Sequence, residues 1–425
     1  MLLRFKVRNL RSIRDQQELS LVASALRDEA GSLIDTPIAG VRAVPSVLIY
    51  GANASGKSNL VLALGWMRDL VLYSQNRGRP GAGVPRQPFR LDPEVAHAPT
   101  AVEIDFIQDG VHHRYGFEAT DREIVTESLF ALPNNRRQLL FERTGSSFEF
   151  GRHLKGRTRT IAELTRPDSL YLSAAMQNAH EELTSVGAFF RDLEVHRDPE
   201  DIGFRVARFL KQVEGRGLDR QIVDLLDHLG TGVIGHRIVE TEVPVKQREF
   251  LAGLTDLLKI LEPGAGVAAP DGMARRLQLA HHDSAGDSQF FDLSDESEGT
   301  RRLLFLIAGM FSALERGATM VIDELDASLH TKACETLLAL FASRATNPRG
   351  AQLIATTHDT NLLHSNLLRR DQIWFTEKDR AGATSLYPLT DIRTRKHDNI
   401  ARGYLQGRYG AVPFAGPVAD LLQAD

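Results

Sequence analysis

The sequence predicts an α/β protein whose core fold is assembled from two separated parts of the chain. An apolar, β-branched run over residues 43–50 is followed by a glycine-containing loop and a helical pattern over residues 57–73. The same alternation of strand and helix patterns returns over residues 303–357. An antiparallel β-meander and a mostly helical insertion are expected between these parts. We therefore expect three regions: an N-terminal lobe over 1–180, the insertion over 181–290 and a C-terminal lobe over 291–425.

The composition is typical of a folded protein with a substantial core. The chain has 425 residues, of which 42% are hydrophobic and 25% charged, so a mostly disordered protein is excluded. Its net charge of −4 excludes a uniformly basic protein but leaves a local basic face open. Cys334 is the single cysteine, which excludes a disulfide framework or a cysteine-based zinc cluster within one chain. The N-terminus lacks a signal-peptide pattern, and the longest apolar run, 303–314, is too short to span a bilayer. We expect a cytoplasmic protein with no membrane partner.

Two different periodicities follow one another in the middle of the chain. Residues 101–150 alternate apolar and polar side chains, which predicts strands with one buried face, and Asp109-Gly110 marks a hairpin turn. Further along, VARFLKQV, QIVDLLDHL and REFLAGLTDLLKIL carry apolar residues three and four positions apart, which predicts helices. The first pattern gives the meander and the second gives the insertion.

Residues 51–58, GANASGKS, fit the phosphate-loop pattern G-x-x-x-x-G-K-[ST] at every position. Glycines let backbone N–H groups turn inward around a phosphate, and the helix that starts at Lys57 presents its positive end. Lys57 would reach the β- and γ-phosphates of ATP, and the Ser58 hydroxyl would ligate Mg²⁺. A chance glycine turn is the alternative, but the strand before the loop and the helix after it favour a nucleotide site. The residues expected to contact ATP are Gly51, Asn53, Ala54, Ser55, Gly56, Lys57, Ser58 and Asn59.

Two further apolar strands are followed by residues whose side chains could bind Mg²⁺, water or phosphate. The strand TMVI is followed by Asp323, which would hold Mg²⁺ together with Ser58, and by Glu324, which would orient or deprotonate the attacking water. The strand over 351–357 delivers His358, whose imidazole would hydrogen-bond the γ-phosphate. Solvated carboxylates at a strand end and a structural histidine are the alternatives. The predicted catalytic residues are Glu324, His358 and Lys57.

The order of these motifs resembles that of ABC-type ATPases, and within them the SMC/RecF-like branch. In that family a serine–glycine signature opens the helix before the acidic strand, and Ser297-Glu298-Gly299 stands there, with Glu298 in place of the first glycine of the more familiar form. The resemblance implies that Ser297 and Gly299 contact the ATP of a second copy, in a homodimer or higher homo-oligomer that sandwiches ATP. A serine helix cap is the alternative. Gln177 stands near the place of the family's Q-loop glutamine, which would contact Mg²⁺, although a surface glutamine after a strand is an equally simple interpretation.

The whole-chain pattern resembles the overcoming-lysogenization-defect (OLD) and RloA-type abortive-infection ATPases. The segments that carry this resemblance are FKVRNLRSI, DGVHHRYGFE, ESEGTRRLL, DELDASLH and YLQGRYGAVP. The resemblance implies slow Mg-ATP hydrolysis that controls a separate effector protein in anti-phage defence. OLD nucleases continue into a Toprim domain, for which the stretch beyond His358 is too short, so a Toprim-like nuclease would be a second polypeptide. This step rests on analogy with the family.

Two other functions remain open from the sequence. A RecF-like DNA-repair clamp would share every ATP residue and bind DNA directly, and basic runs over 152–159 and 393–397 could contact nucleic acid or be solvated loops. A transporter-coupling subunit would need a membrane permease, and His330, at a position where transporters carry aspartate, argues against it. Tyr404 and Tyr409 resemble a family motif of unassigned role, for which packing against the core is the simpler interpretation.

Overall fold

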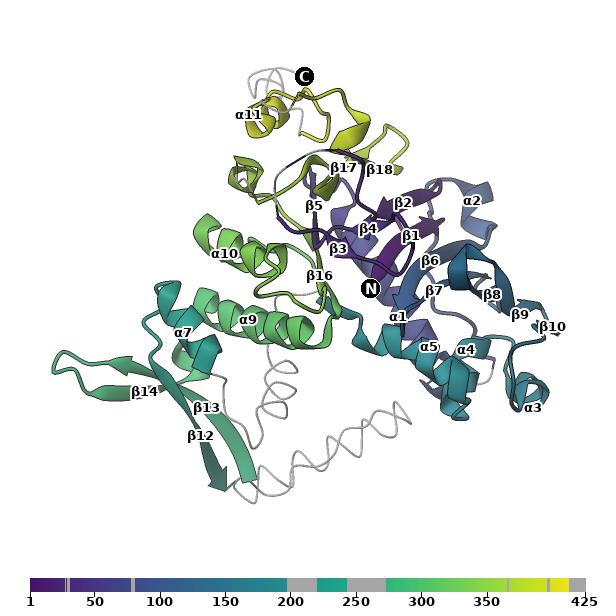
Figure 1. The fold of residues 1–425 in the computed structure, drawn as a ribbon, viewed down its shortest axis with the longest axis horizontal. Helices are drawn as coiled ribbons and strands as arrows, with labels where there is room; N and C mark the ends of the chain where they lie inside the picture. Colours follow the sequence, from purple (N-terminus) through teal and green to yellow (C-terminus); the bar gives the residue numbers. More distant parts are fainter. Residues whose placement is uncertain are drawn as a thin grey trace, which may run out of the picture. The chain divides into compact units, whose positions relative to one another are not determined.

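The computed structural model describes residues 1–26, 28, 31–77, 81–196, 220–242, 273–364, 367–395 and 398–412 (Figure 1). The chain forms two compact units. The first contains Met1–Arg197, Ala313–Asp326 and Cys334–Asp425, and the second contains Asp198–Ser312 and Ala327–Ala333. The first unit therefore combines the two ends of the sequence, as the interrupted α/β pattern predicts.

A seven-stranded antiparallel sheet forms the N-terminal lobe of the first unit (Figure 1). It contains the predicted meander, extended at one edge by the two strands at the start of the chain. The Asp109-Gly110 turn joins its two longest strands with positive φ angles of 51° and 76°, which confirms the predicted hairpin. In spatial order the strands are β10 (Ser147–Phe150), β9 (Gln138–Thr144), β8 (Ile124–Ala131), β7 (Val111–Ala119), β6 (Thr100–Gln108), β1 (Leu2–Arg8) and β2 (Gln17–Ser20).

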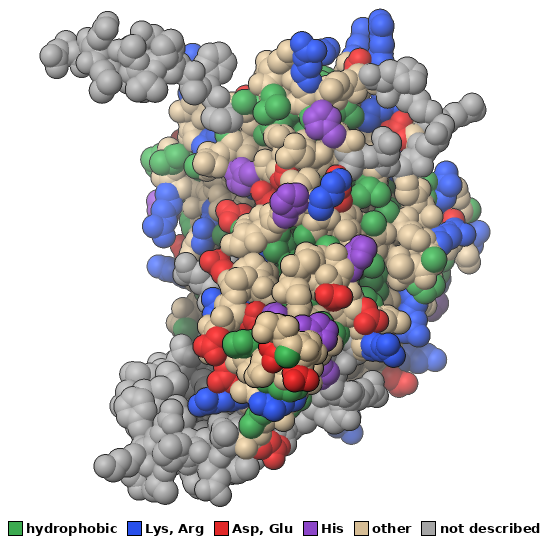
Figure 2. Space-filling model, turned by 90° about the vertical axis from the view of Figure 1, so that its left-hand side faces the viewer, with side chains coloured by type: hydrophobic (Ala, Val, Ile, Leu, Met, Phe, Trp, Pro, Cys, Tyr) green, Lys and Arg blue, Asp and Glu red, His purple; other side chains and the backbone are tan. Residues whose placement is uncertain are grey.

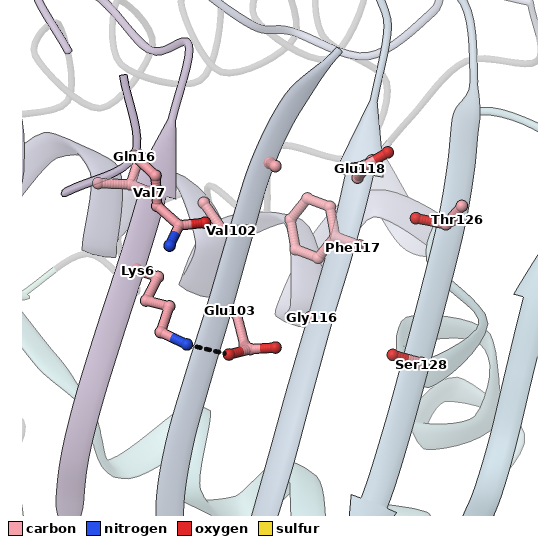
Figure 3. Close-up of a pocket in the computed structure, with 11 residues that line it drawn as sticks. Lys6, Val7, Gln16, Val102, Glu103, Gly116, Phe117, Glu118, Thr126 and Ser128 are labelled. Carbon is pink, nitrogen blue, oxygen red and sulfur yellow. Dashed lines mark hydrogen bonds and ion pairs between the residues drawn. The ribbon is translucent and has the colours of Figure 1, made fainter. Parts of the chain in front are cut away.

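The polar face of this sheet has a shallow hollow of about 260 Å³ centred on Gly116 (Figure 3). A Cβ at this glycine would lie 2.8 Å from the Val102 carbonyl oxygen, so the position needs glycine for the close approach of β6 and β7. At the rim the Lys6 ammonium donates to the Glu103 carboxylate at 2.9 Å, and each group neutralises the other (Figure 3). The hollow is therefore the space left by the missing side chain of Gly116, and the two charged groups at its rim are already paired.

A six-stranded sheet forms the second layer of the first unit and joins segments from both ends of the sequence (Figure 1). Its first five strands are parallel and the last is antiparallel. The carboxyl ends of the parallel strands lie at one edge, where loops and ligands gather in such sheets. In spatial order they are β11 (Glu194–His196), β15 (Thr319–Ile322), β16 (Gln352–Thr356), β5 (Ser46–Gly51), β17 (Ile373–Lys378) and β18 (Thr384–Pro388).

Three helices share one hydrophobic cluster with both sheets: α1 (Lys57–Arg77), α4 (Tyr171–Gln177) and α5 (Glu181–Asp192). Phe106 of the antiparallel sheet stacks on Phe189 of α5 with ring centroids 4.3 Å apart, while Ile49 of the parallel sheet enters the same cluster. This shared burial is the main stabilising contribution to the unit. The remaining elements with residues in the first unit are β3 (Ile34–Asp35), β4 (Arg42–Ala43), α2 (Pro93–His97), η1 (Pro133–Asn135), α3 (Thr158–Leu164), α10 (Thr331–Ala342), η3 (Thr360–His364), η4 (Arg370–Gln372), η5 (Leu389–Asp391) and α11 (Ile400–Leu405).

The second unit overlaps the predicted mostly helical insertion over 181–290, whose overall helical character stays a prediction because many of its residues lie outside the described ones. QIVDLLDHL is confirmed as a helix, but VARFLKQV and REFLAGLTDLLKIL lie outside the described residues. The described part also contains a three-stranded antiparallel sheet, because its strands pair over the length of β13. The unit begins at Asp198 instead of 181, since α5 packs with α1 and α4 in the first unit. Its described elements are α7 (Arg220–His228), β12 (Gly235–Glu242), β13 (Met273–His282), β14 (Ser288–Asp292), η2 (Leu293–Asp295) and most of α9 (Glu298–Arg316).

Across the described ranges, every helix is too short or too polar to cross a lipid bilayer.

His113 makes the stability of the antiparallel lobe sensitive to acid. Burial against Phe106, with ring centroids 5.4 Å apart, is the main cause that lowers the pKa of His113 to about 4 from 6.5. The unfolded chain takes up a proton near pH 6.5 that the folded chain resists until about pH 4, so stability is lost as pH falls through this window. We expect about 3 kcal/mol of destabilisation at pH 4 from this residue. Urea unfolding at pH 7 and pH 4.5 should show a smaller pH dependence for His113→Phe, whereas His97→Gln at an exposed position should behave like the wild type. If the free energy of unfolding changes equally between the two pH values in all three proteins, this role of His113 is wrong.

Candidate nucleotide-binding site

The carboxyl-terminal edge of the parallel sheet brings the predicted phosphate loop and the predicted acidic pair together. Gly51 ends β5, Asp323 directly follows β15, and His358 is the second residue after β16. In the sheet register Ile322 lies beside Ala355, and Thr356 lies beside Ile49. Three segments that are far apart in the sequence therefore end at the same place.

Backbone geometry in the phosphate loop requires small residues at two positions. Gly56 has a φ of +108°, and a Cβ there would collide with the Thr384 side chain. A Cβ on Gly51 would collide with the hydroxyls of Thr376 and Ser55. Ser55 and Gly56 are buried, whereas Asn53 and Ala54 are exposed at the tip of the loop. The loop is thus held at its base and open at its tip.

Hydroxyl groups from distant segments hold the base of this loop. Ser55 Oγ and Thr376 Oγ1 on β17 are 2.6 Å apart, and Thr384 Oγ1 on β18 donates to the Ser55 carbonyl at 2.8 Å. The Thr384 hydroxyl also contacts Ser12 Oγ at 2.7 Å, and the Asn59 amide donates to Ser12 Oγ at 2.6 Å. Asn59, predicted to contact ATP, is thus used within the protein to tie α1 to the N-terminal turn. Thr376, Thr384 and Ser12 were missed by the sequence analysis, because no local motif marks a hydroxyl that becomes adjacent only through sheet pairing.

Lys57 is buried at the start of α1 with 5% of its surface exposed. Its ammonium donates to the carbonyl oxygens of Gly51 at 2.8 Å and Ala52 at 3.1 Å. Burial lowers the pKa of Lys57, and the nearby carboxylates of Asp323 and Glu324 partly offset this effect. The contact of this lysine with a phosphate stays a prediction. Ser58, the next residue, is half-buried in the first turn of the helix.

A single threonine hydroxyl connects the two acidic residues to the neighbouring strand. Thr356 Oγ1 donates to Asp323 Oδ1 at 2.6 Å and accepts from the Glu324 backbone N–H at 2.7 Å. The Leu325 N–H donates to the Thr356 carbonyl at 2.9 Å. Glu324 has a φ of +52°, a left-handed conformation that a non-glycine residue rarely adopts, and its side chain is exposed. The acidic loop is therefore fixed in a strained backbone conformation over the end of β16.

His358 is held by its backbone and exposes its side chain. Its N–H donates to both carboxylate oxygens of Asp326, at 3.1 and 3.2 Å. Asp326 and Thr356 were both missed by the sequence analysis. The sequence does mark both positions. Asp326 lies in the DELD run beside the predicted acidic pair, and Thr356 lies in the TTHD run beside His358.

The predicted signature lies in the second unit and opens α9. Ser297 Oγ accepts from the Thr300 N–H at 3.1 Å, so the contacts within the chain are those of a helix cap. Ser297 and Glu298 are both exposed, and the Glu298 carboxylate accepts from the Ser328 hydroxyl at 3.0 Å. A Cβ on Gly299 would lie 3.0 Å from the Ser328 carbonyl oxygen. The contact of Ser297 and Gly299 with a second copy stays a prediction.

Gln177 and the C-terminal tyrosines have defined positions in the structure. Gln177 is the exposed last residue of α4, so the expectation of a strand before it was wrong, and its contact with Mg²⁺ stays a prediction. Tyr404 stacks on Phe375 with ring centroids 5.4 Å apart and meets Tyr50 edge-on at 5.8 Å. Tyr409 is also buried, 6.0 Å from Phe375, so packing against the core accounts for this C-terminal motif.

Comparison with known proteins assigns the family. Residues 46–364, well over half of the chain, match the family described as "AAA domain, putative AbiEii toxin, Type IV TA system". The chain belongs to this family. The matched range of the AAA-domain family begins with β5, before the phosphate loop, and ends beyond His358, so it contains the loop over 51–58, the acidic pair and His358.

The solved structures that the chain matches include two SMC heads. One is an SMC head bound to the C-winged helix domain of ScpA, with 14% identity, coverage of 91% of this chain and 97% of that chain, and a TM-score of 0.41. The other is the SMC head domain from Thermotoga maritima, with 13% identity, coverage of 91% and 98%, and a TM-score of 0.39. No curated protein matches the chain. At TM-scores below 0.5 these likenesses add nothing to the family assignment.

Proposed function

We propose that this chain is an ABC-type ATPase of the SMC/RecF-like branch, which binds and hydrolyses Mg-ATP. One observation supports the proposal above all others. Lys57 begins α1 after β5, and Asp323 and His358 come after the parallel neighbours β15 and β16, so all three lie at one edge of the parallel sheet. ATP hydrolysis at such a site needs three groups: a cation that binds phosphate, a carboxylate that binds a metal and a carboxylate that activates a water.

The residues at this edge fit ATP and Mg²⁺ chemically. Glycines at positions 51 and 56 keep side-chain atoms out of the loop, where phosphate oxygens would meet backbone N–H groups and the positive end of α1. Ser58 and Asp323 offer a hydroxyl and a carboxylate, which are the oxygen donors that Mg²⁺ prefers. When bound, Mg²⁺ would neutralise phosphate charge during transfer.

Each proposed catalytic residue has a distinct role in the hydrolysis of the β–γ phosphoanhydride bond. Lys57 holds the β- and γ-phosphates. Glu324 orients a water and accepts its proton as the water oxygen bonds to the γ-phosphorus and ADP leaves. His358 donates a hydrogen bond to a γ-phosphate oxygen. The exposure of Glu324 and His358 supports these roles, because both side chains are accessible to a ligand at the sheet edge.

We further propose that two copies close on ATP and control a separate effector. Ser297 is exposed at the N-terminus of α9, where a hydroxyl and the positive helix end suit the γ-phosphate of a second copy. The family description names a toxin of a type IV TA system, which is compatible with a chain that regulates a toxic activity. The proposed effector is a Toprim-like nuclease carried on another polypeptide, acting in anti-phage defence.

A RecF-like DNA clamp is the second candidate function. It is favoured by the exposed basic side chains in the loop after β10 and at the start of α3, which are Arg152, Lys155, Arg157 and Arg159, without an acidic neighbour between them. The face drawn in Figure 2 has a different character, because acidic, basic and histidine side chains are intermixed on it and hydrophobic side chains form only small groups. Direct DNA binding would therefore have to use a local surface.

Hydrolysis and co-purification together test the proposed function. The purified chain is expected to release phosphate from ATP with Mg²⁺ and to stop when EDTA is added. A stoichiometric second polypeptide with nuclease activity, recovered with the chain expressed from its own operon, would support effector control. DNA retained by the chain without any protein partner would favour the clamp, and no phosphate release under any of these conditions would contradict both.

A further inference from the structure

Thr356 lies at the centre of the contacts that shape the acidic loop. It is the last residue of β16 and is fully buried. Its hydroxyl donates its one proton to Asp323 Oδ1 at 2.6 Å and accepts the Glu324 N–H at 2.7 Å. One side chain therefore contacts both the residue proposed to bind Mg²⁺ and the backbone of the residue proposed to activate water.

We propose that Thr356 is a positioning residue for the hydrolysis reaction, which sets the orientation of the Asp323 carboxylate and the backbone of Glu324. The inference rests on the proposed function, since it assigns a role toward Mg²⁺ and water. It assigns no catalytic step to Thr356 itself, because the hydroxyl acts only through its two neighbours.

The hydrogen-bond chemistry explains why a hydroxyl is needed at this position. By donating to Oδ1, Thr356 fixes the rotation of the Asp323 carboxylate and leaves Oδ2 free of this bond, so that a metal meets an oxygen of defined direction. By accepting from the Glu324 N–H, it satisfies a donor in the left-handed conformation at φ +52°. Valine has the same shape but neither function, and a fully buried site offers no bulk water to replace them.

Other hydrogen bonds hold the acidic loop to β16 without the Thr356 hydroxyl. Asp326 accepts the His358 N–H independently of Thr356, and the Leu325 N–H donates to the Thr356 carbonyl, which any residue supplies. The loop therefore stays attached to β16 in a valine variant. We expect the orientation of Asp323 and Glu324 to change while the attachment of the loop is kept.

The test compares Thr356→Val with Thr356→Ser in the full chain. The valine variant is expected to need about 10- to 100-fold more Mg²⁺ for half-maximal activity, or to lose turnover by the same factor. Binding of a fluorescent ATP analogue in EDTA should be unchanged, because the phosphate loop is untouched. Mn²⁺ binding in the presence of ADP, followed by electron paramagnetic resonance, should weaken in parallel, and serine should restore both readouts.

Thr319→Val is the matched control. Thr319 is a buried threonine at the other end of the same strand pair, and its hydroxyl donates to Gln352 at 3.2 Å. This variant loses a buried hydroxyl of the same kind but should keep the wild-type Mg²⁺ requirement. If Thr356→Val and Thr319→Val change Mg²⁺ dependence and Mn²⁺ binding equally, the positioning role is wrong. If the wild type itself neither binds nor hydrolyses ATP, the proposed function fails instead.

Discussion

Replacing Glu324 with glutamine is expected to slow ATP hydrolysis by about 10²- to 10⁴-fold, the usual contribution of a general base. Glutamine keeps the size of the side chain, and the hydrogen bond from the Glu324 N–H to Thr356 uses the backbone, so the left-handed loop should be preserved. What is lost is the carboxylate that accepts a proton from water. ATP binding should therefore remain close to that of the wild type.

Single-turnover phosphate release and equilibrium ATP binding separate these two effects. Glu142→Gln, the same change at an exposed position on β9, is the control and should hydrolyse ATP at the wild-type rate. A Glu324→Gln variant that turns over ATP as fast as this control would show that another group activates the water.

The second large effect is expected from Lys57→Ala, which should weaken ATP binding by about 30-fold or more, equivalent to at least about 2 kcal/mol. The ammonium is buried and already desolvated, so its attraction for a phosphate is weakly screened by water. Its loss leaves two loop carbonyls, those of Gly51 and Ala52, without this donor, but they belong to a loop that Thr376 and Thr384 also hold. We expect a small change in melting temperature beside a large loss of affinity.

Calorimetric titration with ATP in Mg²⁺ measures the loss, and Lys155→Ala at an exposed loop position is the control. Unchanged affinity in Lys57→Ala would mean that ATP does not bind at this loop, whereas an equal loss in Lys155→Ala would indicate a diffuse electrostatic effect.

The parts of the site that could be predicted from the sequence are those whose chemistry is contiguous in the chain. GANASGKS carries its loop, its lysine and its helix start together, and the strands before Asp323 and His358 are apolar enough to be recognised. The pairing of β15 with β16 then brings their ends together, which follows from parallel strands sharing an edge.

The parts that could not be predicted depend on register and on weak periodicity. Thr356 bonds to Asp323 only because β15 and β16 pair in one particular register. YLSAAMQ is a short apolar segment, for which periodicity cannot distinguish a helix from a strand. In the insertion, GHRIVETE forms a strand because it pairs with β13, which is distant in the sequence, whereas the segments around GHRIVETE show the helical spacing of apolar residues.

Native mass spectrometry of the Glu324→Gln chain in excess Mg-ATP tests the central claim most directly. If the sheet edge binds Mg-ATP and the exposed Ser297 end of α9 closes on a second copy, the main species should contain an even number of chains with one ATP for each. ADP should leave the chains separate, and Lys57→Ala should abolish the assembly. A chain that stays monomeric and free of nucleotide under these conditions would contradict the account.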